Sequence, residues 1–332
     1  MESHPPQSGR PSRRQVDPEA LIAGIQAGDR RALARAMTLV EDATDAGREI
    51  IRAVYPNTGR AALLGLTGPP GVGKSSLVAA LVRHIRSADD APQVGVISVD
   101  PSSPFTSGAL LGDRIRLTDH FLDRGVFIRS MGTRGHLGGM AETSLQMALL
   151  LDAYGCGEIF LETVGVGQSE IEIAHIADTV LLVLQPGSGD AVQALKAGIM
   201  EIPDIVVINK SDHPAARELH QQVRSILKLD GERLWTPPII ETNAVSGDGI
   251  ERLWEAIGEH RAHQSHEGRY AARRQANLER EVFSLAAARA SAELARRAES
   301  DSRLRDLLDA MQRRELDPVS CTDRLFEEVF RP

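Results

Sequence analysis

The sequence predicts an α/β fold in which a largely parallel β-sheet lies between two layers of helices. Short apolar runs alternate with helical stretches from about residue 60 to residue 263, a pattern typical of parallel sheets covered on both faces. The chain has 332 residues, of which 42% are hydrophobic, so it can bury a core of this size. Helical patterns on both sides of the alternating segment predict an N-terminal helical extension and a C-terminal helical arm.

The N-terminal region is expected to contain a tail followed by helices. Residues 1–16 include prolines and arginines and lack the apolar stretch of a signal peptide, which predicts a disordered tail. Asp17 can cap a helix that Pro18 starts, and a second helix follows, so residues 17–59 form the helical extension. The apolar positions at helical spacing in these two helices are Leu21, Ile22, Ile25, Leu33, Met37 and Val40.

The central segment, residues 60–263, supplies the strands of the sheet. A helix over residues 75–86 follows the first strand and carries apolar residues at helical spacing. The expected strands are residues 61–67, 94–99, 125–128, 158–162, 179–184, 205–208 and 238–242.

The C-terminal segment, residues 264–332, is rich in Ala, Arg, Glu and Leu and reads as a helical arm. It is too polar to fold alone, so its apolar stripe needs a partner surface. Packing on the chain's own α/β domain is one alternative, and a dimerisation arm is the other, which the coiled-coil-like pattern favours. The apolar positions are Leu278, Val282, Leu285, Leu304, Leu308 and Met311.

A phosphate-binding loop lies between the first strand and its helix. Its residues are Gly68, Pro69, Pro70, Gly71, Val72, Gly73, Lys74 and Ser75. The glycines let successive N–H groups point at phosphate oxygens, and the helix dipole adds positive charge. We expect Lys74 on the β- and γ-phosphates, the Ser75 hydroxyl on Mg²⁺ and Ser76 near the α-phosphate. The strand and helix flanks argue against a chance glycine-rich turn, so the fold is that of a P-loop NTPase.

A second motif, NKSD at residues 209–212, follows an apolar strand and indicates the base. Asp212 can accept hydrogen bonds from the N1–H and 2-amino groups of guanine, and adenine lacks this pair of donors. A strand-ending turn is the alternative, since Asn, Ser and Asp favour turns. Together with the phosphate loop, the motif predicts binding of GTP and GDP rather than ATP. The residues expected to border the guanine are Asn209, Lys210, Asp212, Asn243, Ala244 and Val245.

Composition excludes several other classes of protein. A net charge of −8 argues against nucleic acid as the main partner. No apolar run approaches the ~20 residues of a membrane span. Cys156 and Cys321 lie outside any CxxC motif and fit a reducing cytosol, so we expect a cytoplasmic protein without a membrane partner.

Four further motifs occur along the middle of the chain: VDPSSP at residues 99–104, LGDR at 111–114, TRGHLGG at 133–139 and ETVGVGQSE at 162–170. In this order they resemble the MeaB/ArgK/MMAA-type GTPases, the G-protein chaperones of adenosylcobalamin-dependent acyl-CoA mutases. The resemblance implies a homodimeric GTPase that binds such a mutase, gates loading of its cofactor and protects or reactivates it. The chain lacks the DxHxxG pattern of a cobalamin module, so we expect no cobalamin site of its own.

The resemblance also assigns roles around Mg²⁺ and the γ-phosphate. Asp100 and Glu162 each end an apolar strand and are expected near the Mg²⁺ that Ser75 binds, and Asp113 is expected to join them when GTP is present. Turn formation or helix capping is the alternative for Asp100 and Asp113. The amide of Gly165 is expected to face the γ-phosphate.

Hydrolysis requires a neutralised phosphoryl group and an oriented water molecule. Lys74 and Glu162 with Mg²⁺ serve the first need, whereas Gln168 and Arg134 are candidates for the second; both could equally be solvated loop residues. Turnover is therefore expected to be slow without a partner.

The loop at residues 185–196 corresponds to a third switch in the related family. Asp190, Gln193 and Lys196 would then signal the nucleotide state to the mutase, and an ordinary connection between a strand and a helix is the alternative.

Three other functions remain open from the sequence. A metallochaperone GTPase would need a His- or Cys-rich metal site, and a transport-associated nucleotidase or kinase would need adenine binding, which Asp212 opposes. The third is a binding module whose hydrolysis of GTP is incidental. In that case the substitution Lys74→Ala would leave its effect on the partner protein intact.

Overall fold

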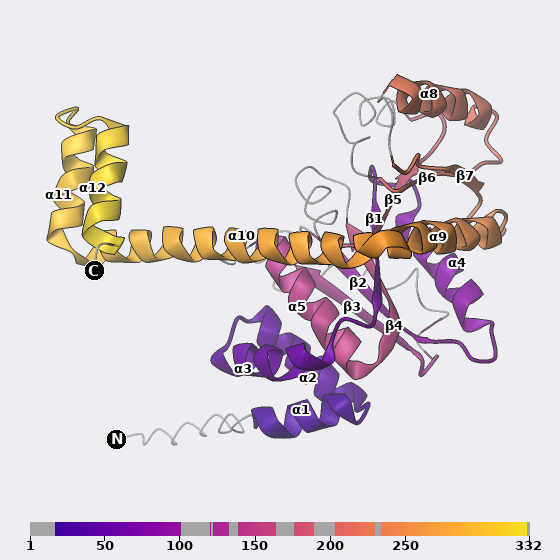
Figure 1. Ribbon diagram of the computed structural model, residues 1–332, viewed down its shortest axis with the longest axis horizontal. Helices are drawn as coiled ribbons and strands as arrows, with labels where there is room; N and C mark the ends of the chain where they lie inside the picture. Colours follow the sequence, from indigo (N-terminus) through magenta and orange to yellow (C-terminus); the bar gives the residue numbers. More distant parts are fainter. Residues whose placement is uncertain are drawn as a thin grey trace, which may run out of the picture.

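A seven-stranded parallel sheet forms the centre of the molecule (Figure 1). The computed structural model describes residues 17–100, 120, 122–132, 139–163, 176–188, 203–229 and 234–330. The strand order is β3-β2-β4-β1-β5-β6-β7, and each predicted strand is confirmed. The strands are β1 (Ala62–Thr67), β2 (Gln93–Asp100), β3 (Val126–Gly132), β4 (Cys156–Thr163), β5 (Thr179–Leu184), β6 (Ile205–Asn209) and β7 (Ile239–Thr242).

The register brings the ends of several strands to one edge of the sheet. Leu66 of β1 pairs with Glu162 of β4, and Asn209 of β6 pairs with Thr242 of β7. Because all these strands run in the same direction, the loops that follow β1, β4 and β6 leave from the same edge. This is where ligands bind in open α/β sheets.

Helices cover both faces of the sheet. One face packs on α4 (Lys74–Arg86) and α9 (Ile250–Ser265), with Leu66, Phe160 and Val183 pointing into this layer of the core. The opposite face packs on α5 (Gly139–Tyr154) at one side and on α8 (Ala216–Leu229) at the other. Side chains that alternate along each strand therefore enter two different cores, as the continuous apolar runs in the sequence require.

The N-terminal helices join the core on the α5 side. They are α1 (Pro18–Gln26), α2 (Arg30–Glu41) and α3 (Asp45–Val54). The predicted cap is confirmed, because the Asp17 carboxylate accepts hydrogen bonds from the N–H groups of residues 19 and 20. Helix α3 was not predicted, although Thr44 caps it and Ile50 and Val54 are buried four residues apart. That cap and that spacing were the available signal.

Strand β3 runs beyond its expected end at residue 128 and includes two polar residues, Arg129 and Ser130. Ser130 is buried in the strand, and Arg129 donates a hydrogen bond to the Glu41 carboxylate of α2 at 2.5 Å. A partner that is 88 positions away in the sequence could not be recognised from local periodicity.

The C-terminal arm is a long helix that ends in a helical hairpin. Helix α10 (Arg269–Ser300) has 32 residues, or roughly 48 Å, and the hairpin of α11 (Ser302–Gln312) and α12 (Pro318–Phe330) lies at its far end, away from the sheet (Figure 1). Leu304 and Cys321 are buried within the hairpin. Packing on the chain's own domain therefore applies to the first turns of α10 and not to the hairpin. No helix in the described ranges is long and apolar enough to cross a bilayer.

Three arginine–carboxylate pairs attach α9 and α10 to the sheet edge opposite the phosphate loop. Each pair makes two hydrogen bonds, and each acidic residue is buried. Such bidentate geometry gives the strongest and most directional form of this contact. The pairs are Arg261–Glu158 at 2.7 and 2.6 Å, Arg273–Asp204 at 2.9 and 2.9 Å, and Arg274–Asp178 at 2.7 and 2.5 Å.

The Asp204 carboxylate has two further partners. Besides Arg273, it meets Nε2 of the fully buried His260 at 3.2 Å and accepts a hydrogen bond from the Val180 N–H at 2.8 Å. Burial, the largest single influence, acts to raise the pKa of Asp204, but the hydrogen bonds from His260 and Arg273 together outweigh it and lower the pKa. The ionised form of Asp204 therefore stabilises the root of the arm, the first turns of α10 that pack on the sheet.

Candidate nucleotide-binding site

The loop between β1 and α4 has the backbone geometry of a phosphate cradle. Gly68 has φ +135° and Gly73 has φ +96°, both in the region that favours glycine. A Cβ atom at Gly68 would lie 2.1 Å from the Val183 carbonyl oxygen, and one at Gly73 would lie 2.5 Å from Nδ2 of Asn209. No side chain caps α4, so its first N–H groups remain available to an anion.

Lys74 lies across this loop. Its ammonium donates hydrogen bonds to the carbonyl oxygens of Gly68 at 2.6 Å and Pro69 at 3.0 Å, and the residue is 95% buried. The positive charge is thereby held beside the first turn of α4. The loop and the first turn of α4 are completed by Pro70, Gly71, Val72 and Ser76.

Ser75 and Glu162 meet at the end of the sheet. The Ser75 hydroxyl donates to the Glu162 carboxylate at 2.5 Å, and both residues are buried. The other Glu162 oxygen accepts a hydrogen bond from the Ser98 hydroxyl of β2 at 3.4 Å. A hydroxyl and a carboxylate beside a phosphate cradle are the oxygen ligands that Mg²⁺ prefers, so these residues fit the ion.

Asn209 connects the phosphate loop to the guanine motif. Its amide donates to the Val72 carbonyl at 2.8 Å, and its oxygen accepts from the Ala244 N–H at 3.1 Å and the Thr242 hydroxyl at 3.3 Å. Lys210, with φ +57°, donates to the Gly71 carbonyl at 2.9 Å. Two motifs that are far apart in the sequence are thus joined by direct hydrogen bonds.

Asn243 orients the carboxylate expected to read guanine. Its Nδ2 donates to Oδ1 of Asp212 at 3.0 Å, while its Oδ1 accepts from the N–H groups of Val245 and Ser246 at 3.0 and 3.2 Å. Asn243 therefore ties Asp212 to the neighbouring loop. This carboxylate is exposed and keeps its second oxygen for a ligand.

Several predicted residues lie outside the described part of the chain. Asp100 ends β2, and its side chain is not among those described. The residues outside the described ranges are Asp113, Arg134, Gly165, Gln168, Asp190, Gln193 and Lys196, and the predicted tail at residues 1–16 lies outside them as well.

Sequence reasoning missed two polar residues of the site. Ser98 contacts Glu162, and Gln185 accepts a hydrogen bond from Lys210 at 2.5 Å. The available signals were a serine within the apolar strand β2 and a glutamine directly after β5, at the edge where the other site residues gather.

Comparison with known proteins identifies the family. A sequence model described as "Methylmalonyl Co-A mutase-associated GTPase MeaB" matches residues 33–299. This chain belongs to the MeaB family of GTPases. The family membership confirms the resemblance found in the sequence and implies that the protein binds GTP.

Relatives and a solved structure agree with this MeaB assignment. A putative GTPase of Pyrococcus abyssi is 44% identical over 319 residues, which cover 94% of this chain and 97% of that protein. The mouse protein named methylmalonic aciduria type A homolog, mitochondrial, is 36% identical over 276 residues, or 77% of this chain and 66% of the relative. A crystal structure of an LAO/AO transport system kinase is 27% identical with a TM-score of 0.73, covering 96% of this chain and 100% of that one. The fold of this MeaB-family GTPase is therefore that of the solved structure.

Proposed function

We propose that this GTPase is a chaperone of an adenosylcobalamin-dependent acyl-CoA mutase. It gates the loading of the mutase cofactor and protects or reactivates the enzyme, with GTP hydrolysis timing the cycle. The observation that carries the proposal is the match of residues 33–299 to a family described as associated with methylmalonyl-CoA mutase. The name of the mouse relative also refers to methylmalonate.

The described geometry supports specific roles for the site residues. Lys74 would contact the β- and γ-phosphates, and Asp212 would accept hydrogen bonds from guanine. Ser75 and Glu162, 2.5 Å apart, would hold Mg²⁺ together with Asp100 and Asp113. When bound, Mg²⁺ supplies positive charge that offsets the charge on the transferring phosphoryl group. The phosphate loop would hold the phosphates, and the guanine motif would fix the base.

The remaining steps of the proposal rest on residues outside the described ranges. Gln168 and Arg134 are the candidates to orient the attacking water, and the Gly165 amide would face the γ-phosphate. Asp190, Gln193 and Lys196 would transmit the nucleotide state to the mutase. We also propose that turnover is slow alone and that the mutase accelerates it, as in GTPases whose transition-state groups are completed by a partner.

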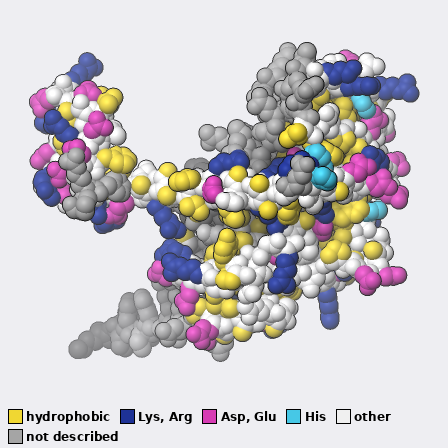
Figure 2. Space-filling model, viewed as in Figure 1, with side chains coloured by type: hydrophobic (Ala, Val, Ile, Leu, Met, Phe, Trp, Pro, Cys, Tyr) yellow, Lys and Arg dark blue, Asp and Glu magenta, His cyan; other side chains and the backbone are white. Residues whose placement is uncertain are grey.

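We propose that the protein is a cytoplasmic homodimer whose two copies meet through the arm. Val282 and Phe283 on α10 are 61% and 73% exposed, and Val319 on α12 is 71% exposed. Hydrophobic side chains lie along α10 in the space-filling view (Figure 2). Exposed apolar surface on a helix that projects from the domain favours a second copy as its partner. We propose residues 17–59, 60–263 and 264–332 as extension, GTPase domain and dimerisation arm.

The test is GTP turnover by the purified protein, alone and with purified methylmalonyl-CoA, isobutyryl-CoA or hydroxyisobutyryl-CoA mutase. We expect one mutase to accelerate turnover by about tenfold or more, because a partner that completes a GTPase site commonly acts this strongly. Release of phosphate and cofactor loading of the mutase are followed in parallel.

Two controls separate the proposal from its rivals. ATP at the same concentration should neither be hydrolysed nor compete, and equal competition by ATP would support a kinase or transport-associated nucleotidase instead. Lys74→Ala should abolish both turnover and the effect on cofactor loading. An unchanged effect on loading would identify a binding module whose hydrolysis is incidental, and turnover that no mutase changes would contradict the chaperone role.

A further inference from the structure

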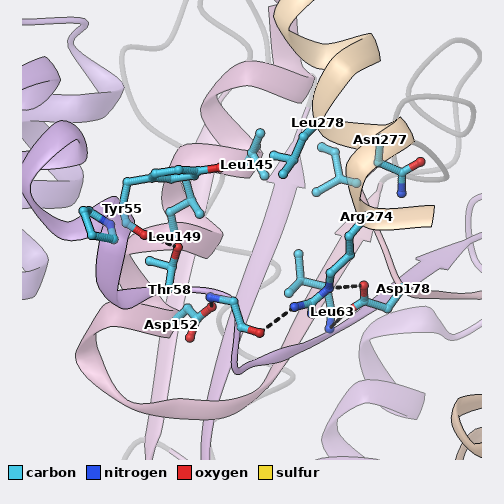
Figure 3. A pocket seen from close by; sticks show the side chains of 13 residues that line it. Tyr55, Thr58, Leu63, Leu145, Leu149, Asp152, Asp178, Arg274, Asn277 and Leu278 are labelled. Atoms are coloured by element: carbon cyan, nitrogen blue, oxygen red, sulfur yellow. Dashed lines mark hydrogen bonds and ion pairs between the residues drawn. The ribbon is translucent and has the colours of Figure 1, made fainter. Parts of the chain in front are cut away.

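A cavity of about 310 Å³ lies at the sheet edge opposite the phosphate loop (Figure 3). It is enclosed by the start of β1, by α5, by α10 and by the short helix η1 (Tyr55–Asn57). Leu63 lies near the first residue of β1, whereas the phosphate loop follows the last, so the two sites are roughly 20 Å apart. The cavity is therefore separate from the nucleotide site.

The walls of the cavity are mainly aliphatic. Five aliphatic side chains line it, and the half-exposed ring of Tyr55 stands at its edge. A volume of this size is at the lower end of the range found for small-molecule sites, which are mostly apolar with a few polar groups. The aliphatic residues are Leu63, Leu145, Leu149, Ile176 and Leu278.

The charged groups at the cavity already have hydrogen-bond partners. The Asp152 carboxylate accepts from the backbone N–H groups of residues 59–61, the shortest at 2.6 Å. Arg274 is engaged by Asp178 and by the carbonyl oxygens of Gly59 and Ala61 (Figure 3). A charged ligand would have to break these contacts, so the cavity favours a neutral one.

Asn277 is the lining residue with an uncommitted donor. The residue is 7% exposed, and its Nδ2 has no hydrogen-bond partner among the described residues. A buried donor without an acceptor is unfavourable. Because the χ2 torsion of asparagine is soft, the amide can turn toward an acceptor in the cavity beside it.

We propose that this cavity binds a small, neutral and largely apolar molecule that presents a hydrogen-bond acceptor, such as a carbonyl oxygen, to Asn277. Its apolar part would contact the leucines of α5 and β1, and its acceptor would satisfy the amide on α10. Since α10 continues into the arm, the bound molecule would join the root of the arm to the GTPase domain.

The experiment uses a matched pair of probes with the full-length protein. Binding of 4-fluoroacetophenone, which has a carbonyl, and 4-fluoroethylbenzene, which does not, is measured by ligand-observed ¹⁹F NMR. We expect both to bind wild type. In Asn277→Leu the ratio of ketone affinity to hydrocarbon affinity should fall by about fivefold or more, because the carbonyl loses its donor.

Variants that fill the cavity test its location. Leu149→Trp on α5 and Leu278→Trp on α10 should each lose binding of both probes, and the pair keeps the test valid if one variant does not fold. Leu122→Trp is the matched control, since Leu122 is 95% exposed and does not line the cavity. Unchanged GDP affinity verifies the fold of each variant.

Three results would overturn the binding site, and a fourth would overturn the stated ligand chemistry. One is the absence of binding of either probe to wild type, and another is wild-type binding by both cavity-filling variants. The third is binding that appears only when the protein is diluted to monomers. That result would indicate that a side chain of a second copy fills the cavity in the dimer. An unchanged ratio of ketone affinity to hydrocarbon affinity in Asn277→Leu would show that Asn277 does not bind the carbonyl. The stated ligand chemistry would then be wrong.

Discussion

Asn209 holds together the two halves of the nucleotide site, and its removal is the most direct test of this arrangement. The side chain is 2% exposed and makes hydrogen bonds to the Val72 carbonyl, the Ala244 N–H and the Thr242 hydroxyl at 2.8, 3.1 and 3.3 Å. The first belongs to the phosphate loop and the second to the guanine loop. We therefore predict that Asn209→Ala loosens both at once.

The magnitude follows from the groups left without partners. The Val72 carbonyl and the Ala244 N–H are both buried, and each unsatisfied buried group costs about 1–3 kcal/mol. The Thr242 hydroxyl has the longest bond and can rotate, so it adds little. The free energy of unfolding of the nucleotide-free protein should fall by about 2–6 kcal/mol. Because the loops must then be ordered on binding, GDP affinity should fall at least about tenfold.

Two measurements check this prediction. Urea unfolding is followed by tryptophan fluorescence, which reports on the GTPase domain because Trp235 and Trp254 both lie there, and GDP binding is measured by calorimetry. Asn57→Ala is the control, since Asn57 is an exposed asparagine. If Asn209→Ala lowered stability by less than about 1 kcal/mol and left GDP affinity unchanged, Asn209 would be only a turn residue and the reasoning would be refuted.

Three further predictions concern Mg²⁺, the arm and pH. Ser75→Ala should bind GTP at least about tenfold more weakly in Mg²⁺ but nearly like wild type in EDTA, as measured with a fluorescent nucleotide; equal losses would exclude a metal role. Arg274→Ala should lower the free energy of unfolding by about 3–5 kcal/mol because Asp178 is 3% exposed, against at most about 1 kcal/mol for the exposed Arg303→Ala. Because the folded-state pKa of Asp204 is lowered from its ordinary value of 3.8, its stabilisation is fully present above that value and lost as pH falls through the folded pKa. The stability difference between wild type and Asp204→Asn should therefore be constant near neutral pH and shrink below about pH 4; a difference that grew in acid would contradict the sign.

The strands and the two nucleotide motifs could be read from the sequence because each depends on local order. β-branched apolar runs such as residues 205–208 are strands in most settings, and the glycines of the phosphate loop work only at their fixed spacing before Lys74. Their alternation with helices also determined that the sheet is parallel. The net charge and the cysteine content served only to argue against other classes of protein.

The third N-terminal helix and the full length of β3 were missed for opposite reasons. Helix α3 had a local signal in its Thr44 cap, which was overlooked. The extension of β3 had none, because the partners of Arg129, Thr38 and Glu41, lie on the distant helix α2. A strand end that depends on a distant partner is not encoded in its own residues.

Tertiary structure alone decided which residues meet. The order of strands places β1 between β4 and β5, and this brings Ser75 to Glu162 across 87 positions of sequence and Arg274 to Asp178 across 96. Hydrogen bonds and ion pairs of this kind depend on distances of about 3 Å between groups whose separation along the chain carries no such information. The sequence by itself determined the family, the nucleotide and the strands, through motifs and periodicity. The contacts of Ser98 and Gln185, the anchoring of α10 and the cavity beside Asn277 exist only because the folded chain brings remote segments together.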